Sequence, residues 1–232
     1  MIQFLSLGAI TMDLLNIVRS SNISRSELIS PRQIEMWIHA YRAILIKQDL
    51  DKGRMANPDY IQELPALELE VVDKSKGSDL GSGQYLLRTK LTIPKTIDLN
   101  YRSGFMYIGT IDDREIQFVP ESRVRWQKFK KYTFNDNLAY LKNGHIYLVY
   151  PEPIEFITVR GIFEVPTEVG NFTNLHADFT YANWDTPYPI SENMIPALKD
   201  MILKRELGIT IQAESDTSND AVNKQESNQE QK

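Results

Sequence analysis

Histidine can act as a general base or a metal ligand near neutral pH, so the histidines are the first candidates for chemistry. His39 lies in a helical-looking segment, His145 follows an Asn-Gly pair, and His176 lies in an aromatic-rich stretch. No two of them are four residues apart, and a zinc site would need ligands from distant segments. We therefore predict no metal site. We interpret His145 as a solvent-facing strand residue beside a turn rather than as a general base.

The other residue patterns that carry catalysis are missing. The sequence has no cysteine, which excludes thiolate nucleophiles and cysteine metal sites. It has no Gly-x-Ser-x-Gly, and "GSDLGSGQ" (77–84) lacks the Gly-Lys-Ser/Thr of a phosphate-binding loop. The adjacent acids Asp112 and Asp113 are typical of a turn. The sequence thus predicts a protein that is not an enzyme and holds no cofactor.

The segment "SRVRWQKFKKY" (122–132) interleaves basic and aromatic side chains. This pattern occurs on surfaces that follow a nucleic-acid backbone and stack its bases. The net charge of −5 argues against a protein that is drawn as a whole onto nucleic acid. Three interpretations stay open: a sheet edge or short helix that buries its aromatic side chains and leaves its basic side chains solvated, a DNA contact, and a charged protein interface. The basic residues concerned are Arg123, Arg125, Lys128, Lys130 and Lys131.

A second aromatic cluster occurs in "FTYANWDTPYP" (179–189). Tyr181, Trp184 and Tyr188 could anchor a protein interface, where Tyr and Trp are enriched, or could pin a long loop to the core. They could also stack on sugar rings. We favour the core or a protein interface.

Helical periodicity is found near the two ends of the chain. Residues 31–50 follow a Ser30 cap and begin with proline, residues 11–19 suggest a shorter helix capped by Thr11, and residues 191–208 end at Gly208. The apolar N-terminus is interrupted by Asp13 and has no early basic residue, so a buried helix is favoured over a signal peptide or membrane span. We expect these helices to pack together, because none could bury its apolar stripe alone.

Between about 60 and 166 the apolar residues recur with period two, which indicates strands. Asn143-Gly144 separates "AYLK" from "HIYLVY" and predicts a hairpin with a type I′ turn. The turn "DDRE" (112–115) similarly predicts a hairpin that joins "FMYIGTI" to "IQFV". The strand "IEFITVRGIFEVP" ends this section at residue 166.

The fold class predicted is α+β. A helical bundle is formed by residues 1–56 and 190–208, and a mainly antiparallel β domain with the Pro/aromatic loop, residues 57–189, is inserted in it. Residues 209–232 form a C-terminal arm. Beyond residue 212 it has 5 acidic residues, 2 lysines and no aromatic residue, so we expect this polar tail to be disordered by itself.

The stretches "HIYLVYP", "VRGIFEVP" and "ISENMIPALKDMILKRELGI" together resemble small structural proteins of tailed bacteriophages. The likeness is to neck and connector proteins, in particular the head-to-tail ring (adaptor) proteins of crAss-like phages. The layout is also similar to podophage tail adaptors, in which a helical bundle carries a β domain and a C-terminal arm docks on the portal.

The resemblance implies a virion structural protein, made in the host cytoplasm, that assembles as a twelvefold ring at the portal–tail junction. Its partners would be further copies of itself, the portal protein and neighbouring neck or tail proteins, with double-stranded DNA passing through the ring and no membrane contact. The basic residues of 123–131 would face the DNA channel or a charged interface. Alternatives are another tail, stopper or tail-hub position, or a β module that recognises carbohydrate or host. The candidate portal or neighbour contacts are Leu207, Ile209, Ile211, Tyr181, Trp184 and Tyr188.

Overall fold

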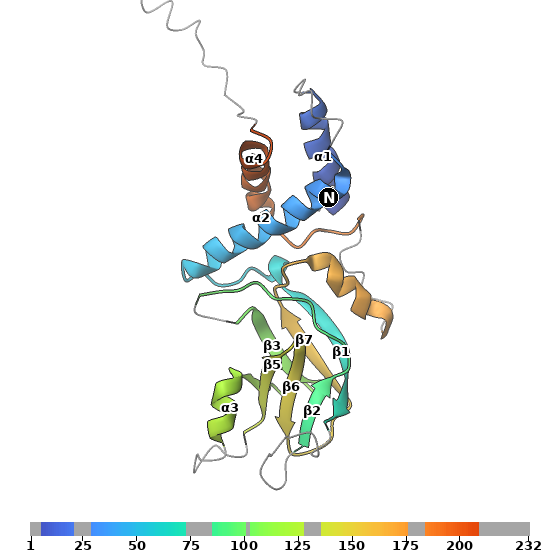
Figure 1. Ribbon diagram of the computed structural model, residues 1–232, viewed down its shortest axis with the longest axis vertical. Coiled ribbons are helices and arrows are strands. Elements are labelled where there is room, and N and C mark those ends of the chain that lie inside the picture. Colours follow the sequence, from blue (N-terminus) through green and yellow to red (C-terminus); the bar gives the residue numbers. More distant parts are fainter. Residues whose placement is uncertain are drawn as a thin grey trace, which may run out of the picture.

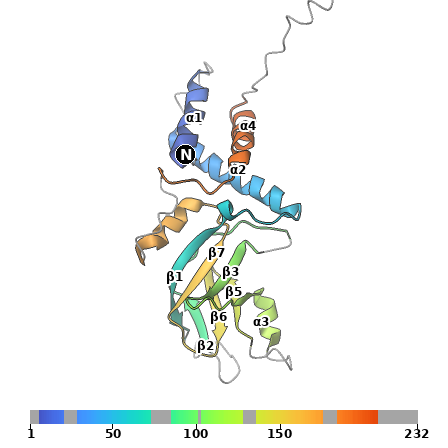
Figure 2. The same cartoon turned by 180° about the vertical axis from the view of Figure 1, so that it is seen from behind.

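The computed structural model describes residues 6–20, 29–72, 85–100, 103–127, 136–175 and 184–208. Helices α1, α2 and α4 lie at one end of the long axis and the strands lie at the other (Figures 1 and 2). Helix α2 crosses between them, with α1 and α4 on one side and the β structure on the other. The protein has both helices and a mixed, nearly closed sheet, so the predicted α+β class is confirmed.

The helices begin where side-chain oxygens can cap them. Helix α2 (Pro31–Asp51) starts with Ser30, whose Oγ accepts a hydrogen bond from the Gln33 N–H at 3.2 Å, as predicted. Helix α1 (Leu7–Ser20) begins earlier than expected, because the Ser6 Oγ accepts from the Ala9 N–H at 3.1 Å. The prediction of Thr11 as the cap is wrong, since Thr11 is buried inside the helix and its hydroxyl donates to the Leu7 carbonyl.

The C-terminal helical segment divides at a proline. A short 3-10 helix, Glu192–Met194, precedes α4 (Ile195–Arg205), which has Pro196 in its first turn, where no backbone N–H is needed. Gly208 has φ +66°, the left-handed conformation expected of a residue that ends a helix. The three helices share one apolar cluster, to which Ile10, Ile38 and Leu198 contribute.

Seven strands form a sheet in the order β3-β7-β1-β2-β6-β5-β4. Every pair is antiparallel except β4 with β5. The strands are β1 (Gln62–Val71), β2 (Tyr85–Thr89), β3 (Phe105–Thr110), β4 (Gln117–Phe118), β5 (Leu138–Lys142), β6 (His145–Tyr150) and β7 (Phe156–Gly161). Helix α3 (Glu121–Gln127) follows β4, and 3-10 helices occupy Pro58–Tyr60 and Pro166–Leu175.

The sheet curls until its two edge strands, β3 and β4, meet. The Ile116 N–H donates to the Ile108 carbonyl at 2.7 Å, and the Thr110 N–H donates to the Arg114 carbonyl at 3.0 Å. The predicted hairpin through 112–115 is therefore only partly formed: its first residues pair across the turn, but β4 then pairs in parallel with β5. We call the line where β3 faces β4 the seam.

One apolar cluster fills the sheet, and another joins the sheet to α2. The interior of the curled sheet is filled by residues such as Leu64, Leu87 and Val159, which are fully buried. A second cluster lies between α2 and the sheet, where Ile46 of α2 packs near Ile162, just beyond β7. Helix α2 thus contributes to the helical cluster with one part of its surface and to the sheet with another.

The β5–β6 hairpin has the predicted turn. Asn143 has φ +52° and Gly144 has φ +77°, the positive values that a type I′ turn requires, and Lys142 pairs with His145 across it. A Cβ added at Gly144 would meet only Thr92 at ordinary contact distance, 3.8 Å. Glycine is therefore favoured here by backbone conformation and not by lack of space.

We expect Gly144→Val to lower the free energy of unfolding by about 1–2 kcal/mol, because a β-branched residue is strained at positive φ. Gly144→Asn is the matched control, with a smaller loss, since Asn tolerates this conformation. Urea unfolding of both variants measures the difference. Equal stability of the valine variant and the wild type would contradict this account of the turn.

Candidate functional site

Arg42 of α2 joins the helices to the sheet. Its side chain is fully buried, its Nε donates to the Pro189 carbonyl at 2.7 Å, and its Nη1 donates to the Phe163 carbonyl at 2.9 Å. Phe163 lies just after β7, and Pro189 lies on the segment that leads to α4. One guanidinium therefore bonds α2 to two segments that are 26 residues apart in the chain.

His39 and Tyr188 complete this buried polar group. The His39 Nδ1 lies 2.8 Å from the Tyr188 hydroxyl, and the Arg42 guanidinium lies 5.6 Å from the Tyr188 ring centroid. Burial and then the positive charge of Arg42 lower the pKa of His39 to about 4, so His39 is neutral at pH 7. Burial also raises the pKa of Tyr188. The Arg42 Nη2 has no hydrogen-bond partner in the described part of the chain.

We did not predict this group, although the sequence contains a signal for it. Arg42 lies in the apolar stripe of α2, directly after Tyr41 and four residues after Ile38, and a charge at such a position is seldom buried without partners. The partners are backbone carbonyls far along the chain, which no local pattern identifies. The group lies in the interior and joins parts of the fold, so we assign it a structural role.

The aromatic loop residues named from the sequence lie in different environments. Tyr188 is 5% exposed and belongs to the helical core, so it does not form part of the surface of this subunit. Trp184 is 39% exposed, and its carbonyl accepts from the Gly8 N–H at 2.9 Å. A Cβ on Gly8 would come within 2.3 Å of the Trp184 indole nitrogen, so the ring lies flush against α1. Tyr181 lies outside the described residues.

The arm begins at the end of the molecule that carries the helices. Leu207 is half-buried against the helical cluster, and no atom of the described residues other than its chain neighbours lies within 4 Å of the Cβ position of Gly208. Ile209 and Ile211 lie outside the described residues.

The basic segment begins in α3. Arg123 is exposed on this helix and Trp126 is 67% exposed, while Val124 packs against the outer face of the sheet. Glu121 of the same helix accepts a hydrogen bond from the Lys142 ammonium at 2.7 Å. Arg125 also belongs to α3, and Lys128, Lys130 and Lys131 lie outside the described residues. A short helix is confirmed for 121–127, but the expectation that the segment buries its aromatic side chains is wrong for Trp126, which is exposed. A DNA contact and a charged interface both stay open.

His145 is held by the sheet. Its Nδ1 lies 2.8 Å from the Thr89 carbonyl, and the Thr89 hydroxyl accepts from the Ile146 N–H at 3.2 Å. The prediction of a strand residue beside a turn is confirmed. The expected exposure to solvent is only partial, because the ring is half-buried and hydrogen-bonds to β2. His176 lies outside the described residues.

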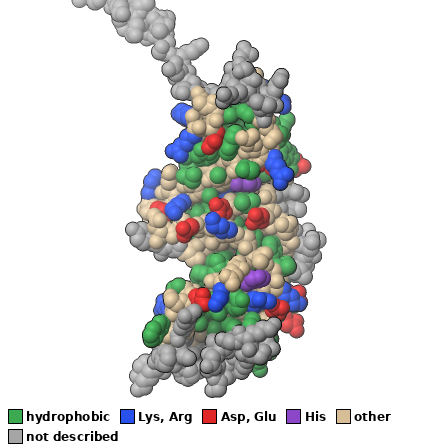
Figure 3. All heavy atoms as spheres, viewed as in Figure 1, with side chains coloured by type: hydrophobic (Ala, Val, Ile, Leu, Met, Phe, Trp, Pro, Cys, Tyr) green, Lys and Arg blue, Asp and Glu red, His purple; other side chains and the backbone are tan. Residues whose placement is uncertain are grey.

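Two wider surveys cover only the described ranges. No group of three His, Asp or Glu side chains in them could hold a metal ion, and none of their helices is long and apolar enough to cross a membrane. On the face drawn in Figure 3, acidic and basic side chains are interspersed and do not form one large field of a single sign.

Comparison with known families relates the chain to phage structural proteins. The model of a family described as phage tail ring protein 2, from crAss-like phages, matches residues 9–228. The chain belongs to this family. A search of curated proteins found no match.

Membership of the phage tail ring protein 2 family confirms the predicted resemblance and the coarse role drawn from it. This ring protein is a structural component of a phage tail and belongs to the virion, and the family is not a class of enzymes. A ring protein associates with itself and with tail partners. In such a protein, the buried polar group of Arg42, His39 and Tyr188 acts on the stability and shape of the subunit.

We expect Arg42→Met to lower the free energy of unfolding of the ring protein by about 2–4 kcal/mol. Two buried carbonyls lose their donors, at about 1–3 kcal/mol each, and removal of the buried charge offsets part of that loss. Arg54→Met is the control, because Arg54 is exposed and forms an exposed ion pair with Asp49, and it should change stability by less than about 0.5 kcal/mol. Equal effects of the two substitutions in urea unfolding would contradict the joining role of Arg42.

The low pKa of His39 makes stability depend on pH. Below pH 6.5 the unfolded chain binds a proton at His39 that the folded chain does not bind until about pH 4. Stability should therefore fall as the pH decreases from 6.5 to 4, by up to about 2–3 kcal/mol from this residue. Unfolding of the wild type and His39→Gln across this range isolates the effect, since contributions from carboxylates are common to both. Parallel stability curves for the two proteins would contradict the prediction.

Proposed function

We propose that this ring protein assembles as a twelvefold ring at the portal–tail junction and guides or seals the DNA channel. The observation that carries the proposal is the match to the phage tail ring protein 2 family over residues 9–228. Twelve copies would match a portal of the same symmetry, so that each subunit meets equivalent partners.

The shape of the subunit supports assembly into a ring. A closed ring needs a heterologous contact, in which two different surfaces of the same chain meet. The elongated subunit has helices at one end and a curled sheet at the other, so its two ends present different elements to a neighbour. In this proposal Trp184, Leu207, Ile209 and Ile211 contribute to contacts with the portal or with a neighbouring copy. Tyr188 instead supports this surface from inside.

The charge of the chain is compatible with DNA passing through a ring without being retained. The net charge is −5, and the charges on the visible face are mixed in sign. Strong binding to DNA would require several cations contacting phosphates. In this proposal the segment that begins at Arg123 lies near the channel or against an acidic partner.

The same family match favours one alternative, a ring further along the tail that does not touch the portal. A sugar-recognising module receives no such support, because Tyr188 lies in the core and Trp184 lies against Gly8. The two ring positions differ in their expected partner, which can be tested directly.

We expect the purified protein to form discrete rings of twelve copies, by itself or on addition of the portal protein of the same phage. Light scattering after size exclusion gives the mass, and electron microscopy gives the symmetry. The portal of an unrelated phage is the control, and it should not bind. Rings that form but bind neither portal protein would favour a position further along the tail. A monomer under all of these conditions would contradict ring formation itself.

A further inference from the structure

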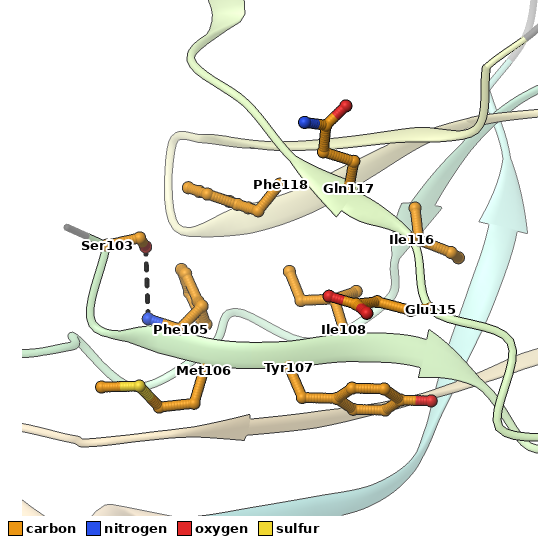
Figure 4. Close-up of a pocket in the computed structure, with 9 residues that line it drawn as sticks. All are labelled: Ser103, Phe105, Met106, Tyr107, Ile108, Glu115, Ile116, Gln117 and Phe118. Carbon is orange, nitrogen blue, oxygen red and sulfur yellow. Dashed lines mark hydrogen bonds between the residues drawn. The ribbon is translucent and has the colours of Figure 1, made fainter. Parts of the chain in front are cut away.

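The seam between β3 and β4 is closed at one end and open at the other. Gly109 and Glu115 form an antiparallel bridge, and the Ile108–Ile116 bond is the last that the structure describes between the two strands in this direction. Beyond it the strands separate around a hollow of about 530 Å³ (Figure 4). The hollow is lined by Ser103, residues 105–108 and residues 115–118.

The edge of β4 that faces this hollow has backbone groups available for pairing. On its other side β4 pairs in parallel with β5, with Phe118 opposite Ala139, and the Val119 N–H donates to the Ala139 carbonyl at 2.8 Å. Peptide groups alternate in direction along a strand, so the N–H and C=O of Phe118 point away from β5 and toward β3. A strand edge in this condition is a template for another extended segment.

The hollow is lined by the apolar side chains of Phe105, Ile108 and Ile116 together with the polar side chains of Ser103, Glu115 and Gln117. Phe105 and Ile108 project from β3 on the side that faces β4, whereas Tyr107 projects to the opposite side (Figure 4). The Phe105 and Phe118 rings lie 5.0 Å apart between centroids, and Phe118 is only half-buried. A segment with apolar side chains on one face and polar side chains on the other would match these surroundings.

We propose that the seam binds residues 209–212 of a neighbouring copy as an added strand. These residues read Ile-Thr-Ile-Gln directly after Gly208, so in an extended conformation Ile209 and Ile211 share one face while Thr210 and Gln212 share the other. The residues that follow are mostly polar, with 5 acidic residues, 2 lysines and no aromatic residue. The two isoleucines are therefore the side chains of residues 209–232 best suited to contact the apolar side chains that line the hollow.

The geometry favours a second copy over the same chain. Gly208 lies beyond α4, while the seam lies in the sheet, and α2 stands between them in both views (Figures 1 and 2). Four residues span at most about 14 Å when fully extended, which is less than the length of α4's 11 residues, about 16 Å, and α2 lies beyond α4 on the way to the sheet. The donor segment and the acceptor seam belong to different parts of the subunit, so their pairing is heterologous and can close a ring. The inference deepens the proposed function by naming a contact within the ring.

The seam can be tested without a ring. A labelled peptide with the sequence GITIQAES is titrated into the full-length Ile209→Asp/Ile211→Asp variant, whose own arm cannot compete. The control peptide carries Asp in place of both isoleucines. We expect at least tenfold tighter binding of the native peptide, with slower hydrogen exchange at residues 105–110 and 115–119. Equal binding of the two peptides, or protection only elsewhere in the chain, would overturn the proposal.

The role in assembly has a matched pair of variants. Ile209→Asp/Ile211→Asp should abolish self-association, whereas Thr210→Asp/Gln212→Asp makes the same change in charge on the other face and should preserve it. Rings that persist in the first variant would overturn the inference and leave the ring proposal intact. If the wild type stays monomeric but the peptide still slows hydrogen exchange at the seam, the acceptor site is supported and the ring is contradicted.

Discussion

The buried guanidinium of Arg42 is the constraint on which the rest of the subunit depends. A charge removed from water is costly unless it is hydrogen-bonded, and here the bonds go to the carbonyls of Phe163 and Pro189. Those carbonyls belong to the end of the sheet and to the segment before α4, so α2 can satisfy its arginine only when both are in place. The bonds therefore couple the packing of the helices to that of the sheet. Because His39, beside Tyr188, is neutral at pH 7, it adds no second positive charge that would repel the Arg42 guanidinium.

The second determining feature is the incomplete closure of the sheet. Strand β4 has only two residues and pairs in parallel with β5, and the structure describes no backbone bond from it to β3 beyond the Ile108–Ile116 bond. The sheet is thereby left with an opening, lined by apolar and polar side chains, rather than a sealed barrel. In the proposed ring contact, this unsealed strand edge receives residues 209–212 of a neighbouring copy.

Much of the secondary structure could be predicted because its signals are local. The turn at Asn143-Gly144 requires two positive φ values, which these residues tolerate. Ser30 supplies a side-chain acceptor to the first turn of α2, and Pro196 is tolerated only near a helix start. The errors have local causes too. Thr11 could cap a helix by composition, but Ser6 lies at the actual start and Thr11 is buried within it. The turn at 112–115 could suggest a full hairpin, but the choice of β5 as the partner of β4 depends on long-range packing.

The sequence by itself determined the α+β class, the antiparallel character of the sheet, the absence of cysteine chemistry and the resemblance to phage ring proteins, because these follow from periodicity, composition and short motifs. Only the tertiary structure decided that Arg42 is buried, that Tyr188 lies in the core rather than on a surface, and that the seam opens beyond Ile108. Each of these three features depends on contacts between residues that are far apart in the sequence. Such contacts are set by the packing of the whole chain and not by neighbouring residues.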